Sequence, residues 1–271
     1  MPTLSTQVDR LSIIIEVGEV PVRVNTSDPE FLRILQQGYA GFVSGSAHPE
    51  IDFDVEITPP LQDEPDADVE VTQSGGSWRL RRGDFRAEWE PSRRRGWIRQ
   101  TANPFAIDSV LRIVHSLVLA RQGGFLLHSA SAIRNGKAFL FAGQSGAGKT
   151  TISSLAPSDA ILLTDEISYV RRRDDGYVAF GTPFTGELAK VGQNVSAPVA
   201  ALYLLGQGAE NRIDAVEPAE AARSLLSNVL FFADEPELVQ AIFHSAFEFV
   251  ERVPVSRLTF APDARVWELI G

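Results

Sequence analysis

The feature that most constrains this chain is a run of small residues placed directly behind an apolar one. Residues 137–143 read KAFLFAG, and residues 143–150 read GQSGAGKT. A short apolar run bounded by turn signals is typical of a buried strand, and glycine adopts backbone conformations that other residues avoid. The order of the residues therefore predicts a buried strand, then a tightly turned loop, then the start of a helix.

The loop matches in full the pattern G-x-x-x-x-G-K-[ST] of phosphate-binding loops. In such loops the glycines let backbone N–H groups converge on phosphate oxygens, and the helix N-terminus adds positive potential. We therefore expect ATP or GTP to bind here, with Lys149 neutralising the β- and γ-phosphates and Thr150 offering its hydroxyl to Mg²⁺. A glycine-rich turn that binds no ligand is the alternative. The predicted nucleotide-binding residues are Gly143, Gln144, Ser145, Gly146, Ala147, Gly148, Lys149, Thr150 and Thr151.

Two adjacent acids follow the loop at the end of the next predicted strand. The apolar run ILL leads into Asp165 and Glu166, and Pro157 shortens the helix that precedes it. A buried strand in this place should end beside the phosphate loop. Carboxylates there can hold Mg²⁺ and can accept the proton of an attacking hydroxyl. A solvated turn is the alternative.

Most of the first hundred residues are expected to form β-strands. β-Branched residues or period-two alternation mark these segments, and Gly and Pro turns separate them. A helix is expected to begin at Pro29, behind the capping candidates Ser27 and Asp28. The later strands of this region should pair antiparallel. The expected strands are 10–17, 20–24, 51–57, 68–73, 77–82, 85–90 and 96–100.

The character of the sequence changes near Pro104. Apolar residues recur at helical spacing from Ile107 to Val118, and Gly123 and Gly124 can end this helix. Asn135-Gly136 is a strong hairpin signal between strands 125–133 and 137–143. Further strands are expected at 160–170, 199–205 and 255–262, and helices at 217–232 and 235–253. We therefore predict a mixed α/β fold with a mostly β domain at 1–104 and a phosphate-loop domain at 105–271.

The composition excludes several classes of function. A formal net charge of -10 argues against broad attraction to nucleic acid or anionic lipid, and the absence of cysteine excludes disulfides, thiolate metal sites and cysteine nucleophiles. No apolar run approaches the roughly 20 residues of a membrane helix, and Asp9, Arg10 and Glu16 interrupt the start, where a signal peptide would be apolar. We expect a cytoplasmic protein that binds neither nucleic acid nor membrane. Whether it forms a homo-oligomer stays open.

Two further patterns have a structural and a functional interpretation. Arginines cluster at 79–82, 93–95 and 171–173, either as solvated faces or as a docking site for an acidic partner. The segment GTPFTGELAK at 181–190 is either a structural turn or a loop that closes on nucleotide or acceptor. Lone histidines are usually structural, which is the expectation for the histidines outside the motif region. These are His48, His115 and His244.

The segments HSASAI (128–133), GKAFLFAGQSGAGKTT (136–151) and ILLTDE (161–166) together resemble the HPr kinase/phosphorylase family. They also resemble the nucleotide-binding region of phosphoenolpyruvate carboxykinases. Both groups have a histidine on the strand before the loop, a G-x-S-G-x-G-K-[ST] loop and an Asp-Asp pair soon after. The resemblance implies a P-loop fold with a mixed sheet and a phosphoryl-transfer reaction.

By position, the resemblance implies that Asp165 is the base for the acceptor hydroxyl and that Glu166 is a Mg²⁺ ligand. It makes His128 a partner of the metal, the phosphate or the base. The family usually has Asp where this chain has Glu166, which keeps the charge on a longer arm. The segment that HPr kinases use for the reverse phosphorolysis is not found, and the chain is too short for a carboxykinase.

The leading hypothesis is a Mg²⁺-dependent kinase that phosphorylates a serine-type hydroxyl in a protein, a peptide or a small molecule. The first domain would then serve acceptor recognition or assembly. The alternative is a nucleotide-binding regulatory module without transfer activity. The presence of His128, Lys149, Thr150 and Asp165 together favours the enzyme.

Overall fold

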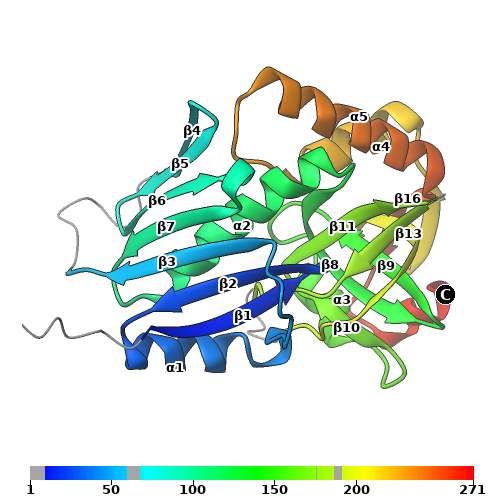
Figure 1. Ribbon diagram of the computed structural model, residues 1–271. Helices are drawn as coiled ribbons and strands as arrows, with labels where there is room; N and C mark the ends of the chain where they lie inside the picture. Colours follow the sequence, from blue (N-terminus) through cyan, green and yellow to red (C-terminus); the bar gives the residue numbers. More distant parts are fainter. Residues whose placement is uncertain (1–9, 60–67, 175, 186–190) are drawn as a thin grey trace, which may run out of the picture. The chain divides into compact units, whose positions relative to one another are not determined.

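The computed structural model describes residues 10–59, 68–174, 176–185 and 191–271 (Figure 1). The chain divides into two compact units, residues 1–111 and 112–271. The division falls inside helix α2 (Pro104–Arg121), a few residues after the domain boundary that the sequence predicts. Both units combine helices with a mixed sheet, which confirms the predicted mixed α/β class.

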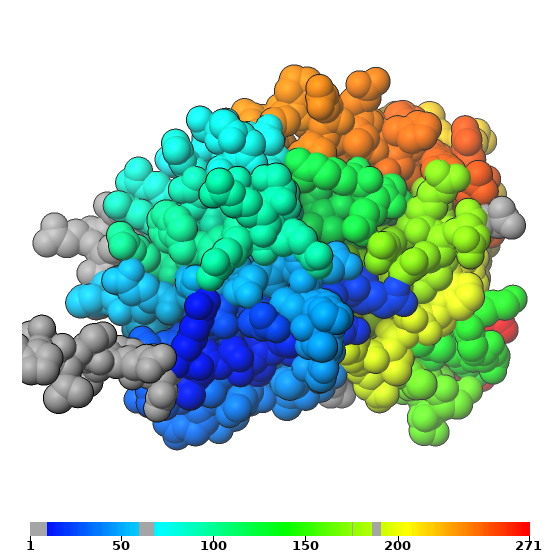
Figure 2. Space-filling model, viewed as in Figure 1, coloured from blue at the N-terminus to red at the C-terminus, as the bar shows by residue number. Residues whose placement is uncertain are grey.

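The first unit is built on a seven-stranded sheet in the order β1-β2-β3-β7-β6-β5-β4. Along β3, Phe53 and Val55 are buried whereas Asp54 is only partly buried and Glu56 is exposed, because successive side chains of a strand point to opposite faces. In the space-filling view, side chains of these strands, blue to cyan, form the surface of the unit (Figure 2). The strands are β1 (Leu11–Val17), β2 (Val20–Thr26), β3 (Ile51–Ile57), β4 (Glu70–Ser74), β5 (Ser77–Arg82), β6 (Phe85–Glu90) and β7 (Arg95–Gln100).

Helix α1 (Pro29–Gly38) starts as the sequence predicts. The Asp28 carboxylate accepts hydrogen bonds from the backbone N–H groups of Glu30 and Phe31, at 2.8 and 3.0 Å, and Pro29 occupies the first turn. An N-cap of this kind stabilises a helix by about 0.5–2 kcal/mol relative to alanine. The helix buries Phe31 and Leu35 and contacts β1 and β2.

The second unit is built on a nine-stranded sheet whose main path is β10-β8-β11-β12-β13-β16-β14. Strand β9 pairs with β8 and β13, and β15 pairs with β8. Helices α3 (Lys149–Ser154), α4 (Pro218–Leu226) and α5 (Pro236–Arg252) follow in the chain, and α4 contacts α5. The strands are β8 (Phe125–Arg134), β9 (Lys137–Ala142), β10 (Ile161–Thr164), β11 (Ile167–Arg173), β12 (Gly176–Phe180), β13 (Ser196–Gln207), β14 (Arg212–Ala215), β15 (Val229–Leu230) and β16 (Val255–Phe260).

Three parallel strands end at one edge of this second sheet. Strand β13 is parallel both to β9, with Leu204 opposite Ala142, and to β16, with Gln207 opposite Phe260. The segments that leave the carboxyl ends of β9, β13 and β16 therefore meet at the same edge. The segment after β9 is the glycine-rich loop.

The structure corrects two sequence predictions and adds one strand pairing that was not predicted. Segment 160–170 is not one strand but two, β10 and β11, separated at Asp165 and Glu166. The helix expected over 217–232 ends at Leu226, because residues 229–230 instead pair with β8. Strand β3 runs parallel to β2 and β7, a pairing that the alternation within single strands does not reveal.

No helix in the described part of the chain is long and apolar enough to cross a membrane. The acidic, proline-rich stretch at 59–68 lies almost wholly outside the described residues.

Candidate functional site

The glycine-rich loop follows β9 and has a shape that requires its glycines. Gly146 and Gly148 have φ angles of 79° and 109°, in a region that residues with side chains rarely adopt. A Cβ atom on Gly148 would lie 2.7 Å from the ring of Phe260, and one on Gly143 would lie 2.7 Å from Cβ of Ala147. The loop is therefore tightly packed as well as tightly turned.

Lys149 begins helix α3 and is 8% exposed. Its ammonium Nζ donates a hydrogen bond to the carbonyl oxygen of Gly143 at 2.8 Å and a longer one to that of Gln144 at 3.4 Å. The lysine thus folds back over the loop that precedes it.

Asp165 and Glu166 occupy the turn between β10 and β11. Strand β8 pairs with β10 through Ser131–Ile133 and with β11 through Phe125–His128, so the two acids lie where β8 changes partner. The hydroxyl of Thr164, which is fully buried, accepts hydrogen bonds from the backbone N–H groups of Glu166 and Ile167, each at 3.2 Å. This side chain fixes the turn, and Asp165 is held there 3% exposed.

His128 lies on β8 opposite Ile167, next to the acid pair. Its Nδ1 is 3.4 Å from Oε1 of Glu166. Partial burial lowers the pKa of His128 below its ordinary value of 6.5, the positive charges of Lys149 and Arg112 lower it further, and Glu166 opposes them. The imidazole is therefore mainly neutral at pH 7.

The structure brings most of the predicted site residues to one cavity of about 490 Å³. Three loop residues of the predicted set, Gly143, Gln144 and Ala147, instead line a second cavity of about 420 Å³, which shares Ser145 and Gly146 with the first. We call the first cavity the phosphate cavity. It is lined by His128, Ser145, Gly146, Gly148, Lys149, Thr150, Thr151, Asp165 and Glu166.

The segment GTPF at 181–184 supports the strand that carries the acids. The backbone N–H of Thr182 donates to the carbonyl of Leu163 at 3.1 Å, and the hydroxyl of Thr164 donates to the carbonyl of Phe184 at 3.4 Å. The rest of the predicted closing loop, including Gly186, Glu187 and Lys190, lies outside the described residues. The described half of the segment is thus a structural element, and closure on a ligand stays a prediction.

Sequence reasoning missed three residues around this site. Arg112 acts on His128 through its charge, and its guanidinium lies 5.1 Å from the centre of the Phe184 ring. Gln207 donates from Nε2 to the carbonyl of Gly146 at 2.6 Å, and Thr164 organises the acid turn. Arg112 and Gln207 belong to no local motif, because they reach the site from segments distant in the chain. Thr164 lies inside the segment ILLTDE, directly before Asp165, where its position before the acid pair was the available signal.

The residues present suit a magnesium ion held partly by phosphate oxygens. The described residues contain no group of three or more His, Asp or Glu side chains that could hold a metal ion. Mg²⁺ is commonly bound by one or two carboxylates together with substrate phosphates. Thr150, Asp165 and Glu166 supply a hydroxyl and two carboxylates on the wall of the phosphate cavity, which fits that pattern.

The chain is similar to a known protein family and, at low similarity, to solved structures. A family model described as "SynChlorMet cassette protein ScmC" matches residues 99–271, more than half of the chain. The structure of the Hpr(Ser) kinase/phosphatase from Coxiella burnetii matches with 8% identity and a TM-score of 0.27, covering 50% of this chain and 84% of that chain. A TM-score this low carries no argument about fold or reaction. No curated protein matches the sequence.

Proposed function

We propose that this chain, which belongs to the ScmC family of SynChlorMet cassette proteins, is a Mg²⁺-dependent phosphotransferase. The proposal is based on the chemistry of the phosphate cavity. The chain transfers the terminal phosphoryl group of ATP or GTP to a serine-type hydroxyl of a protein, a peptide or a small molecule.

The observation that carries the proposal is the content of one cavity. The lining of this cavity combines residues of a phosphate-loop sequence, including Lys149 and the hydroxyl-bearing Thr150, with the carboxylates of Asp165 and Glu166. Phosphoryl transfer depends mainly on positioning and on neutralising phosphate charge, and these residue types serve both needs. Lys149 and Asp165 are both buried on this cavity, so one positive and one negative side chain are held beside the loop.

Each side chain has a defined task in this proposal. Lys149 neutralises charge on the transferring phosphoryl group, and Asp165 accepts the proton of the attacking hydroxyl. Thr150 and Glu166 would hold Mg²⁺, which when bound neutralises phosphate oxygens. His128 is neutral and lies 3.4 Å from Glu166, so it orients that carboxylate without cancelling its charge.

The test is transfer of label from γ-labelled Mg-ATP or Mg-GTP to a panel of serine peptides and small alcohols, with release to water measured in parallel. Asp165→Asn should lower the transfer rate on the order of 10²- to 10⁴-fold while keeping nucleotide affinity, as expected for a lost general base. Glu166→Gln should raise the Mg²⁺ concentration needed for half-maximal rate. Asp159→Asn, an exposed acid paired with Arg134, is the matched control.

Two results would contradict the proposal. Equal and small effects of both substitutions would remove the assigned roles from Asp165 and Glu166. Tight Mg-nucleotide binding by the unmodified chain, with no label passed to any acceptor or to water, would identify it as a binding module without transfer activity.

A further inference from the structure

A third cavity lies next to the phosphate cavity, beside helix α3 and the ends of β13 and β16. Its volume is about 490 Å³, within the roughly 300–1,000 Å³ typical of small-molecule sites. We propose that this cavity is the nucleoside pocket, which receives the base and sugar of the nucleotide. The inference rests on the proposed function, because it requires that a nucleotide be the phosphoryl donor. The lining residues are Gly148, Thr151, Gln207, Gly208, Phe260 and Pro262.

The nucleoside pocket and the phosphate cavity share two residues, Gly148 and Thr151. Thr151 directly follows Thr150, which lines the phosphate cavity alone. A phosphate chain that starts beside Lys149 and Asp165 and passes Thr151 would therefore lead into this pocket. The loop itself connects the two spaces, so one ligand with a phosphate end and a second, uncharged end can occupy both.

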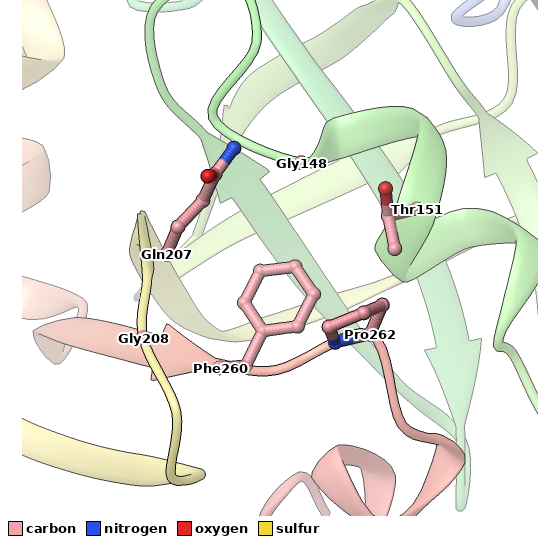
Figure 3. A pocket seen from close by; sticks show the side chains of 6 residues that line it. All are labelled: Gly148, Thr151, Gln207, Gly208, Phe260 and Pro262. Atoms are coloured by element: carbon pink, nitrogen blue, oxygen red, sulfur yellow. The ribbon is translucent and has the colours of Figure 1, made fainter.

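The walls of the nucleoside pocket suit a flat uncharged ring. Among the residues that the structure describes, those that line it include no lysine, arginine, aspartate or glutamate. Figure 3 shows the Phe260 ring directed toward the loop at Gly148, with Pro262 beside it and Thr151 across the space. Phe260 is 3% exposed and belongs to a buried hydrophobic cluster, so it forms a rigid base to the pocket. Aromatic and proline surfaces of this kind favour contact with a nucleobase.

Gln207 and Gly208 provide the polar side of the pocket. Gln207 is the last residue of β13 and lies opposite Phe260 on β16. The N–H of Gly208, the next residue, donates to the carbonyl of Phe260 at 3.1 Å. The Gln207 side chain also donates a hydrogen bond to the carbonyl of Gly146, and Figure 3 shows it directed toward the loop. The pocket wall and the phosphate loop are thus joined by a hydrogen bond, so the pocket has a fixed distance to the phosphate loop.

The cavity of about 420 Å³ that Gly143, Gln144 and Ala147 line differs from the nucleoside pocket in its lining residues. It joins the phosphate cavity at Ser145 and Gly146 and is lined partly by polar groups that include Asn228 and Arg257. Arg257 in that cavity is already paired with the carboxylate of Glu220, so its guanidinium is held by an acid of the chain itself. The uncharged pocket at Phe260 is therefore the better site for the nucleoside, and the polar cavity remains available to other parts of a reaction complex.

The pocket can be tested by filling it in the full-length chain. Calorimetric titrations of the unmodified chain, Pro262→Trp and Pro262→Ala would use Mg-ATP, Mg-GTP and Mg-tripolyphosphate. Tripolyphosphate carries the phosphate end of the ligand without a nucleoside. Pro262→Trp should weaken binding of the preferred nucleotide roughly 5- to 150-fold, the effect of a lost base contact, and should leave tripolyphosphate affinity within about twofold. Pro262→Ala should keep nucleotide affinity close to that of the unmodified chain.

The outcomes separate this inference from the proposed function. If nucleotide and tripolyphosphate bind equally to the unmodified chain, or if Pro262→Trp binds nucleotide normally, the nucleoside pocket is wrong while the phosphate site stands. If the unmodified chain binds none of the three ligands, both proposals fail.

A second measurement needs no substitution, which protects the test if Pro262→Trp does not fold. Photolysis of 8-azido-ATP bound to the unmodified chain should attach the base to residues near Gly208 or Pro262, as read by peptide mass spectrometry. Attachment near Asn228 or Arg257 would place the base in the opposite cavity and overturn the inference.

Discussion

Lys149 is a buried cation of the site, and its ammonium group donates hydrogen bonds to two loop carbonyls. Replacing it with alanine removes the charge that would face the phosphates. A hydrogen bond to a charged group contributes about 1.5–3 kcal/mol, so Lys149→Ala should weaken Mg-nucleotide binding roughly 10- to 150-fold. Titration calorimetry measures this loss, and Lys137→Ala, at an exposed lysine on β9, is the control. Unchanged affinity in Lys149→Ala would reject the phosphate-loop assignment.

His115 provides a prediction about stability and pH. It is fully buried on α2, with Tyr169 and Phe184 at ring distances of 5.6 and 6.5 Å, and burial lowers its pKa to about 4. Between pH 6.5 and 4, His115 is therefore mostly protonated in the unfolded chain and mostly neutral in the folded chain. The stabilisation is complete above pH 6.5 and decreases as the pH falls, by on the order of 2–3 kcal/mol at pH 4.

Urea unfolding of the unmodified chain and of His115→Leu, followed from pH 7.5 to pH 4, measures this effect. The Arg112 guanidinium, which packs on Phe184, stays charged throughout, so it does not change over this range. His115→Leu should lose distinctly less stability than the unmodified chain as the pH falls. Parallel losses in the two proteins would show that His115 does not control the acid response.

At the scale of elements, the acid pair depends on how the segment at 191–193 packs against β10. A Cβ atom on Gly192 would lie 1.7 Å from the carbonyl oxygen of Leu163, and the N–H of Gly192 donates to the carbonyl of Thr182. Gly192→Ala must therefore displace either this segment or β10, the strand that leads to Asp165. Overpacking of this kind destabilises by about 1–3 kcal/mol.

We expect Gly192→Ala to lower the thermal unfolding midpoint and to slow phosphoryl transfer, because the turn at Asp165 shifts. Gly176→Ala is the matched control, since its Cβ would have no neighbour within 4 Å. Calorimetric scans and transfer rates on both variants make the comparison. If Gly192→Ala unfolds at the same temperature as Gly176→Ala, the packing argument is incorrect.

At the scale of the whole molecule, the first unit is the candidate for recognising the phosphoryl acceptor. The first unit has a cavity of about 370 Å³ lined by Asp54, Arg93, Arg95 and Trp97 among others. Trp97 is 40% exposed, and both signs of charge lie around it. These features support, as a proposal, the recognition of a charged polypeptide acceptor by this unit.

Reversing charge in this cavity tests the proposal. Arg93 pairs with Glu90 and Arg95 with Asp54, and both are well exposed. Arg94 is left out, because its guanidinium binds the carbonyls of Pro49 and Glu50 and is needed for the local fold. Arg93→Glu with Arg95→Glu should raise the acceptor KM severalfold and leave nucleotide affinity unchanged. Arg33→Glu, at an exposed arginine of α1, is the control.

A fragment that starts at Pro104 provides the complementary measurement. The hydrophobic cluster around β9, β13 and β16 lies wholly in the second unit, as do all residues of the phosphate cavity. Residues 104–271 should therefore fold, bind Mg-nucleotide with the affinity of the full chain and phosphorylate the acceptor poorly. A fragment that phosphorylates normally, or a double reversal with unchanged acceptor turnover, would exclude the first unit from recognition.

Much of the local structure was predictable from the sequence. Strands β3, β5 and β6 have the bounds that alternation predicts, and Asn135 and Gly136 adopt the positive φ angles of 51° and 73° that such hairpins need. The glycine-rich loop lies between a strand and a helix as its pattern predicts. These features depend on residues a few positions apart, so side-chain periodicity and backbone sterics are sufficient to determine them.

What only the tertiary structure decided is how distant segments combine. The parallel order of β9, β13 and β16 brings Gln207 and Phe260 to the phosphate loop, and the change of partner along β8 sets His128 beside Glu166. The same long-range pairing ends α4 at Leu226, where the sequence continues the helix. Strand order depends on contacts between residues far apart in the chain, and no periodicity within one segment contains that information.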